Sequence, residues 1–140
     1  MMLGASSDAA TTLRVLVVDD NAVLRDHVRV ALEDAGLMVV GEAADGAHAL
    51  AQAGIRDPDV VLMDLRMPGM DGIQAALALR EQQPEIRVVL WTGENDAELA
   101  SAIRKSGAHA GVAKGTRTVE LVAILRRVCE GCPRPRRGGG

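Results

Sequence analysis

Short runs of apolar, mostly β-branched residues recur along the chain, and each is followed by a segment with helical periodicity. The first run, Arg14–Val18, is typical of a parallel strand that is buried on both faces. In the segment after it, Asn21 is a suitable N-cap and Gly36 a suitable C-terminal stop for a helix. Five residues are expected on the inner face of that helix: Leu24, Val28, Ala31, Leu32 and Ala35.

The same order of strand and helix repeats along the rest of the chain. Further strands are predicted at Leu37–Ala43, Asp59–Met63, Arg87–Trp91 and Ala110–Ala113. Further helices are predicted at Ala47–Ala53, from Asp71 to Gln83, from a cap at Asn95 or Asp96 to near Gly107, and from Thr118 to Glu130. Five strands alternating with five helices require a parallel sheet covered on both faces. The expected fold is α/β, a flavodoxin-like doubly wound sheet with strand order 2-1-3-4-5 in a single domain.

Composition adds boundaries to this domain. Residues 1–12 are small and polar and are expected to be a disordered leader, residues 13–131 the folded domain, and residues 132–140 a flexible basic and glycine-rich tail. We interpret the tail arginines, Arg134, Arg136 and Arg137, as a solvated linker.

The aromatic content limits both the core and the chemistry. The chain has one Trp and no Phe or Tyr, so the core must be aliphatic and no mechanism can use a phenol. A net charge of −3 gives no field that attracts nucleic acid. No apolar run is long enough to cross a bilayer and no signal peptide is evident, so a cytoplasmic protein is expected.

The two cysteines, Cys129 and Cys132, close the last predicted helix as a C-x-x-C pair. A zinc site needs further ligands, and a redox pair is expected to open a helix rather than end one. We therefore interpret Cys129 as a packing residue and Cys132 as part of the tail.

Polar residues stand at the carboxyl ends of four predicted strands, where open α/β sheets bind ligands. Asp19 and Asp20 follow the first strand, Asp64 the third, Thr92 the fourth and Lys114 the fifth. Three converging carboxylates repel one another unless a cation lies between them, and oxygen ligands favour Mg²⁺. One carboxylate can then accept a phosphoryl group, while a hydroxyl and an ammonium hold its other oxygens.

Four motifs carry a family resemblance: LVVDDN (16–21), LMDLRMPGMDG (62–72), LWTGEN (90–95) and GAHAGVAK (107–114). Together they resemble the motif set of bacterial response-regulator receivers, over roughly residues 13–131, and look closest to receivers that precede a LuxR-type helix-turn-helix. The resemblance implies a domain of a two-component system that is phosphorylated by a sensor histidine kinase.

Position by position, the resemblance assigns roles to the residues at the strand ends. Asp64 matches the phosphoacceptor, Lys114 the lysine that contacts the phosphoryl group, and Thr92 the switch hydroxyl. The implied Mg²⁺ ligands are Asp20 directly, Asp19 largely through water, Asp64, and the backbone carbonyl of Arg66. Pro68 and Gly69 shape the loop after the acceptor, and Gly72 admits the next helix.

The chain also departs from the family pattern. Gly111 stands where the family usually has a Tyr or Phe whose ring swings inward on activation, so the usual readout is in doubt. Gly115 replaces a proline that follows a cis bond, and a trans bond is expected. Arg66 and Glu94 occupy two positions that flank the phosphate, and a salt bridge between them would screen it from water.

Two other functions stay open beside the phosphorylated switch. A pseudo-receiver would act as a protein-binding scaffold without phosphate-driven switching, which Gly111 favours. A Mg²⁺-dependent phosphohydrolase would need a second acid two residues after the nucleophile, where this chain has Arg66. The protein is therefore not expected to be an enzyme beyond its own phosphorylation and slow dephosphorylation. A homodimer or a downstream protein is left open as the partner, with no membrane and no direct nucleic-acid binding.

Overall fold

Five parallel strands form one sheet in the order β2-β1-β3-β4-β5, as the alternating pattern predicts. The structure is a computed structural model that describes residues 12–93 and 96–130. The strands are β1 (Arg14–Val18), β2 (Met38–Ala43), β3 (Val60–Asp64), β4 (Arg87–Thr92) and β5 (Ala110–Ala113). The helices are α2 (Ala22–Asp34), α3 (Gly46–Arg56), α4 (Gly72–Gln82), α5 (Asp96–Ser106) and α6 (Thr118–Val128).

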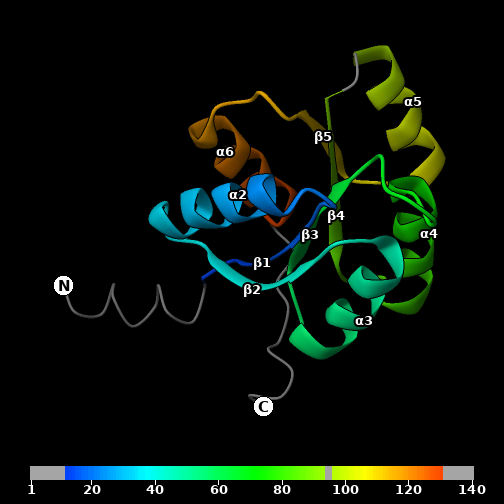
Figure 1. Cartoon of the computed structure of the whole chain (residues 1–140), viewed down its shortest axis with the longest axis horizontal. Coiled ribbons are helices and arrows are strands. Elements are labelled where there is room, and N and C mark those ends of the chain that lie inside the picture. The colour runs from blue at the N-terminus through cyan, green and yellow to red at the C-terminus, as the bar shows by residue number, and fades with distance from the viewer. Residues whose placement is uncertain (1–11, 94–95, 131–140) are drawn as a thin grey trace.

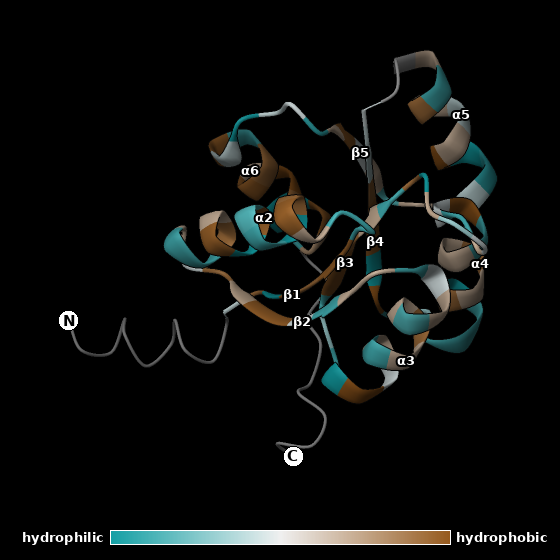
Figure 2. Ribbon diagram, viewed as in Figure 1, coloured by the Kyte–Doolittle hydropathy of each residue, from teal (hydrophilic) through white to brown (hydrophobic). Residues whose placement is uncertain are grey.

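The helices cover both faces of the sheet, with α2 and α6 on one side and α3, α4 and α5 on the other (Figure 1). Alternate residues of the central strands enter two separate cores. Leu16 and Leu90 belong to the core beneath α3, α4 and α5, whereas Val17 and Trp91 belong to the core beneath α2 and α6. Figure 2 shows the hydrophobic residues concentrated on the strands and on the helix faces that lie against them. This arrangement confirms the doubly wound fold.

The element ends differ from the predicted ones for local reasons. Helix α3 is longer than Ala47–Ala53, because the Asp45 side chain accepts a hydrogen bond from His48 N at its start and Asp57, at φ 51°, ends it. Strands β3 and β4 include Asp64 and Thr92 themselves, and α6 ends at Val128.

Helix α2 is held as expected at its start, where Asn21 Oδ1 accepts hydrogen bonds from Val23 N and Leu24 N, each at 3.1 Å. The prediction that Ala35 lies on the inner face of α2 is wrong. Ala35 is exposed, because it is the C-cap of the helix rather than part of its last turn. Gly36 follows it with φ 94°, a left-handed conformation that favours glycine.

Three predictions fall wholly or largely outside the described residues: the leader, the tail with Cys132 and its arginines, and the cap of α5 at Asn95 or Asp96. No helix among the described residues has both the length and the apolar character to cross a membrane.

Candidate functional site

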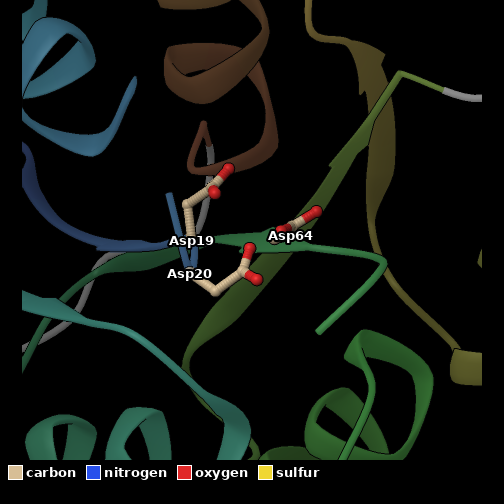
Figure 3. Close-up of side chains that lie close together, drawn as sticks. All are labelled: Asp19, Asp20 and Asp64. Carbon is tan, nitrogen blue, oxygen red and sulfur yellow. The ribbon is translucent and has the colours of Figure 1, made fainter. Parts of the chain in front are cut away.

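The carboxyl ends of β1 and β3 bring three carboxylates together. Asp19, Asp20 and Asp64 each offer an oxygen atom, and these oxygens all lie within 4.8 Å of one another. Asp19 and Asp64 are buried, whereas Asp20 is exposed. Figure 3 shows the three side chains side by side at this edge of the sheet. The structure therefore places these carboxylates together, as parallel strands with a common carboxyl edge require.

The turn between β1 and α2 fixes the orientation of Asp19. Its backbone N donates to Ala43 O on β2 at 3.0 Å, and its Oδ1 accepts a hydrogen bond from Asn21 N at 2.8 Å. The Arg25 guanidinium reaches back from α2 and donates to the Asp19 carbonyl oxygen. Backbone and side chain of Asp19 are thus both held before any ligand binds.

The loop between β3 and α4 brings backbone very close to Asp64. Arg66 N donates to Asp64 Oδ1 at 3.2 Å, and Gly72 N donates to Leu65 O at 3.0 Å. A Cβ atom at position 72 would lie 2.4 Å from the Asp64 carbonyl oxygen. Only glycine therefore lets α4 begin this close to β3, which confirms the expectation for Gly72.

Lys114, directly after β5, completes the arrangement. Its Nζ lies 2.9 Å from Asp19 Oδ2 and 3.1 Å from Asp64 Oδ1. Its backbone N donates to Thr92 O at 2.9 Å, so the buried Thr92 is fixed beside it on β4. The ammonium also lies 5.3 Å from the centre of the Trp91 ring. All the residues that sequence reasoning assigned to this edge are therefore brought together.

The electrostatics of the site favour an added cation. Burial raises the pKa of Asp64, and the Asp19 charge raises it further, although Lys114 and the Arg66 amide lower it. Burial lowers the pKa of Lys114, but the carboxylates of Asp19 and Asp64 beside its ammonium raise it overall. The Lys114 ammonium thus lies beside two of the three carboxyl groups, and burial makes the ionised form of Asp64 costly.

The donor set fits a hard divalent cation. All three side chains offer oxygen atoms, and the buried Asp19 Oδ2 has the Lys114 ammonium beside it but no hydrogen bond of good geometry within the described part of the chain. Magnesium binds through one or two carboxylates and keeps several waters. Asp19, Asp20 and Asp64 could hold it at this edge, with Asp20 exposed toward solvent.

The space around Gly111 explains how this domain packs without the expected ring. A Cβ atom at position 111 would lie 2.7 Å from Ile103 Cδ1 and 2.8 Å from Leu99 Cδ1. These two α5 side chains fill the volume that a larger residue would need. Sequence reasoning identified the missing aromatic but not its replacement, for which the only signal was the helical spacing of two apolar residues on α5.

Several other expectations have clear outcomes. Arg66 forms an ion pair with Glu98 of α5, whereas the expected partner Glu94 lies outside the described residues. The described chain contains no cis peptide bond, which confirms a trans bond before Gly115. His109 Nδ1 accepts a hydrogen bond from Val88 N at 3.1 Å, which ties the start of β5 to β4. Cys129 packs against the α2–α6 core, as expected.

Comparisons with known proteins agree with this geometry. Residues 15–126 match the family model of the response regulator receiver domain. The chain is 38% identical over 120 residues to the response regulator GacA of Pseudomonas viridiflava, an alignment that covers 85% of this chain and 56% of GacA. It therefore spans little more than half the length of that relative.

Two solved structures show the same fold. The signal receiver domain of the putative response regulator NarL from Mycobacterium tuberculosis is 37% identical, with a TM-score of 0.78 over 86% of this chain and 98% of that one. A LuxR-family two-component response regulator from Aurantimonas is 34% identical, with a TM-score of 0.77 over 84% of this chain and 87% of that one.

Proposed function

Because the chain belongs to the response regulator receiver domain family, we propose that it accepts a phosphoryl group from a sensor histidine kinase onto Asp64. The observation that carries this proposal is the convergence of Asp19, Asp20 and Asp64 with the Lys114 ammonium at one sheet edge. The likeness to a LuxR-family structure supports the expected subgroup. Receiver domains act in two-component signalling with histidine kinases and are not classical enzymes.

The proposed reaction uses the chain's own groups in distinct roles. An oxygen of the Asp64 carboxylate forms a bond to phosphorus while the bond between phosphorus and the donor's imidazole nitrogen breaks, and the electron pair leaves with the imidazole. Lys114, 3.1 Å from Asp64 Oδ1, supplies positive charge beside the transferred group. Thr92, held beside Lys114 by the backbone hydrogen bond, supplies a hydroxyl for a phosphoryl oxygen.

The proposed metal ligands are Asp19, Asp20, Asp64 and the backbone carbonyl of Arg66. Bound Mg²⁺ supplies positive charge that offsets the three carboxylates and the charge of the phosphoryl group. Receiver domains generally bind Mg²⁺ at such an acidic pocket, and the oxygen-only donor set of this chain fits it.

The proposed setting is the cytoplasm, with the kinase as donor and a second copy or a downstream protein as recipient of the signal. The domain boundaries of the proposal are residues 13–131, with a leader before them and a tail after them. Relatives of this chain include response regulators and a putative transcriptional regulator, so control of transcription by a longer protein is part of the proposal.

The test is phosphorylation by a small donor. The protein is incubated with Mg²⁺ and acetyl phosphate, and its intact mass is measured beside Asp64→Asn and Asp59→Asn. Asp64 and Asp59 are two buried acids, one at the end of β3 and one directly before it. A phosphoryl adduct that needs Mg²⁺, persists in Asp59→Asn and is lost in Asp64→Asn is expected. An unmodified wild-type chain, also with a panel of histidine kinases, would refute the proposal and leave the scaffold function.

A further inference from the structure

Arg25, on the first turns of α2, connects the acidic turn to strand β2. Its side chain is 18% exposed, and its Nε lies 3.0 Å from Glu42 Oε1. One of its terminal nitrogens donates to the carbonyl oxygen of Asp19. A single guanidinium therefore joins the backbone of the Asp19–Asp20 turn to a carboxylate on the neighbouring strand.

The neighbouring Arg29 has a different set of partners. Its Nε lies 3.1 Å from Glu42 Oε2, and its other nitrogens contact Asp26 and Glu33 on α2 itself. Within the described part of the chain, the ion pairs of Arg29 all go to carboxylate side chains, and none goes to the Asp19–Asp20 turn. Arg25 and Arg29 lie on the same helix, carry the same charge and both pair with Glu42. Of the two, Arg25 is the one that donates a hydrogen bond to the Asp19–Asp20 turn.

The turn needs such a restraint because its two acids are close to a third. The oxygens of Asp19, Asp20 and Asp64 lie within 4.8 Å of one another, and their mutual repulsion pushes the turn away from β3 when no cation is present. A hydrogen bond from a charged donor to a backbone carbonyl is stronger than one from a neutral donor. The Arg25 guanidinium donates such a hydrogen bond to the Asp19 carbonyl oxygen, and the Glu42 carboxylate compensates much of its positive charge.

We propose that Arg25 is a positioning residue of the cation site, which sets the Asp19 and Asp20 carboxylates in binding geometry before the cation arrives. The inference rests on the proposed Mg²⁺ site and adds the residue that pre-organises it. Partners that orient metal ligands from outside the coordination shell commonly change metal affinity by about 10- to 100-fold when they are removed.

The direction in which Mg²⁺ affinity changes when Arg25 is replaced distinguishes a positioning role of Arg25 from the effect of its positive charge alone. Removal of a positive charge beside an acidic cluster would by itself strengthen cation binding. Loss of the hydrogen bond to the Asp19 carbonyl would weaken it, because the turn would then have to be ordered by the cation. The proposal therefore predicts weaker binding in a variant with one positive charge fewer.

The experiment compares Arg25→Gln with Arg29→Gln in the full chain. Both variants lose one positive charge from α2. Dissociation constants for Mg²⁺ are measured by fluorescence of Trp91, the only tryptophan, and by the rise in melting temperature with Mg²⁺ concentration. Urea unfolding in EDTA measures any loss of stability that is independent of the metal. Phosphorylation by acetyl phosphate is then followed at saturating Mg²⁺.

Arg25→Gln is expected to raise the dissociation constant about tenfold, with a phosphorylation rate near that of the wild type once Mg²⁺ is saturating. Arg29→Gln is expected to leave the constant within about twofold, and Arg25→Lys to recover part of the affinity through one remaining donor. Unchanged or tighter binding in Arg25→Gln, or an equal loss in Arg29→Gln, would overturn the role of Arg25. A wild-type chain that binds no Mg²⁺ would overturn the proposed site as well.

Discussion

Replacement of Asp64 by asparagine should stabilise the metal-free protein, because the buried carboxylate repels its neighbours. Asp64 is 2% exposed and shares its site with Asp19 and Asp20. Asparagine keeps the shape of the side chain and removes its charge. The variant therefore tests the electrostatic cost of the site separately from its packing.

The size of the effect follows from the distances. At an effective dielectric constant of about 20, two carboxylates at 4.8 Å, the upper bound on these separations, repel by about 3.5 kcal/mol, and Asp64 has two such neighbours. The attraction to the Lys114 ammonium at 3.1 Å amounts to about 5 kcal/mol on the same scale. The repulsions exceed the attraction, burial of Asp64 adds to the cost, and solvent around the exposed Asp20 reduces it. A net gain of about 1–2 kcal/mol in the free energy of unfolding is expected for Asp64→Asn.

The direction of the pKa shift of Asp64 also indicates that its charge destabilises the folded protein. Burial and the Asp19 charge raise this pKa in the folded protein, so the folded chain holds its proton to a higher pH than the unfolded chain does. The contribution of Asp64 to stability is therefore full below the unfolded pKa of about 3.9 and is lost as the pH rises through the folded pKa. In Asp64→Asn this loss is absent.

The assay is urea unfolding in EDTA near pH 7.5, with Asp59→Asn as the matched control. Asp59 is a buried acid directly before the same strand, and its Oδ2 accepts a hydrogen bond from Arg14 N at 2.9 Å. Its replacement weakens a charge-assisted hydrogen bond and should lower the free energy of unfolding by about 1 kcal/mol. The two variants are thus expected to move in opposite directions.

The reasoning is refuted if Asp64→Asn is less stable than the wild type without metal, or if both variants move in the same direction. Saturating Mg²⁺ provides a second check. It should stabilise the wild type by mass action and should reduce or reverse the advantage of Asp64→Asn, which has lost one ligand.

Three further predictions concern packing and pH. Gly72→Ala should lower the free energy of unfolding in urea by about 2 kcal/mol or more, because its Cβ would lie 2.4 Å from the Asp64 carbonyl oxygen. Gly115→Ala, with open space around it, should stay within about 0.5 kcal/mol of the wild type. Gly111→Tyr should lower the free energy of unfolding by roughly 3 kcal/mol, because Leu99 and Ile103 already occupy the space. Leu99→Ala should lower it less in the Gly111→Tyr background than in the wild type, and additive losses in this double-mutant cycle would contradict the contact between positions 99 and 111. Burial and nearby arginines lower the pKa of His109, so stability should fall as the pH drops from about 7 to 5, and His109→Gln should flatten this slope in unfolding measured at both pH values.

The sequence was sufficient for the fold because each strand is an apolar run that only a sheet with two covered faces can bury. The order of the strands follows from the rules for parallel connections. Element ends were less predictable, because they depend on single contacts. The end of α3 is one example, since the pattern predicted a helix over Ala47–Ala53 and the helix continues to Arg56, where Asp57 ends it with φ 51°.

The candidate site was predictable to the extent that it depends on strand ends. Asp64, Thr92 and Lys114 follow from topology, since parallel strands place their carboxyl ends at one edge. The contacts of Arg25 with the Asp19 carbonyl and of Lys114 with the Trp91 ring depend on side-chain conformations set by tertiary packing. No spacing rule distinguishes Arg25 from Arg29, four residues later, although their contacts differ.

The packing around Gly111 has a consequence for signal readout. Gly111 pairs with Leu90 on β4, two residues before Thr92, and Leu99 and Ile103 of α5 fill the space above it. If Thr92 moves toward a phosphoryl group, no ring on β5 can follow it, because that space is already packed. Contact with the aliphatic side chains of α5 gives the movement a route to this helix, and close-packed cores respond to such shifts by small displacements of whole helices. Leu99→Ala would then uncouple α5 from the site while leaving phosphorylation of Asp64 intact. Amide hydrogen exchange of α5, measured with and without acetyl phosphate, should change in the wild type and not in Leu99→Ala; equal changes in both would show that the signal leaves the site by another route.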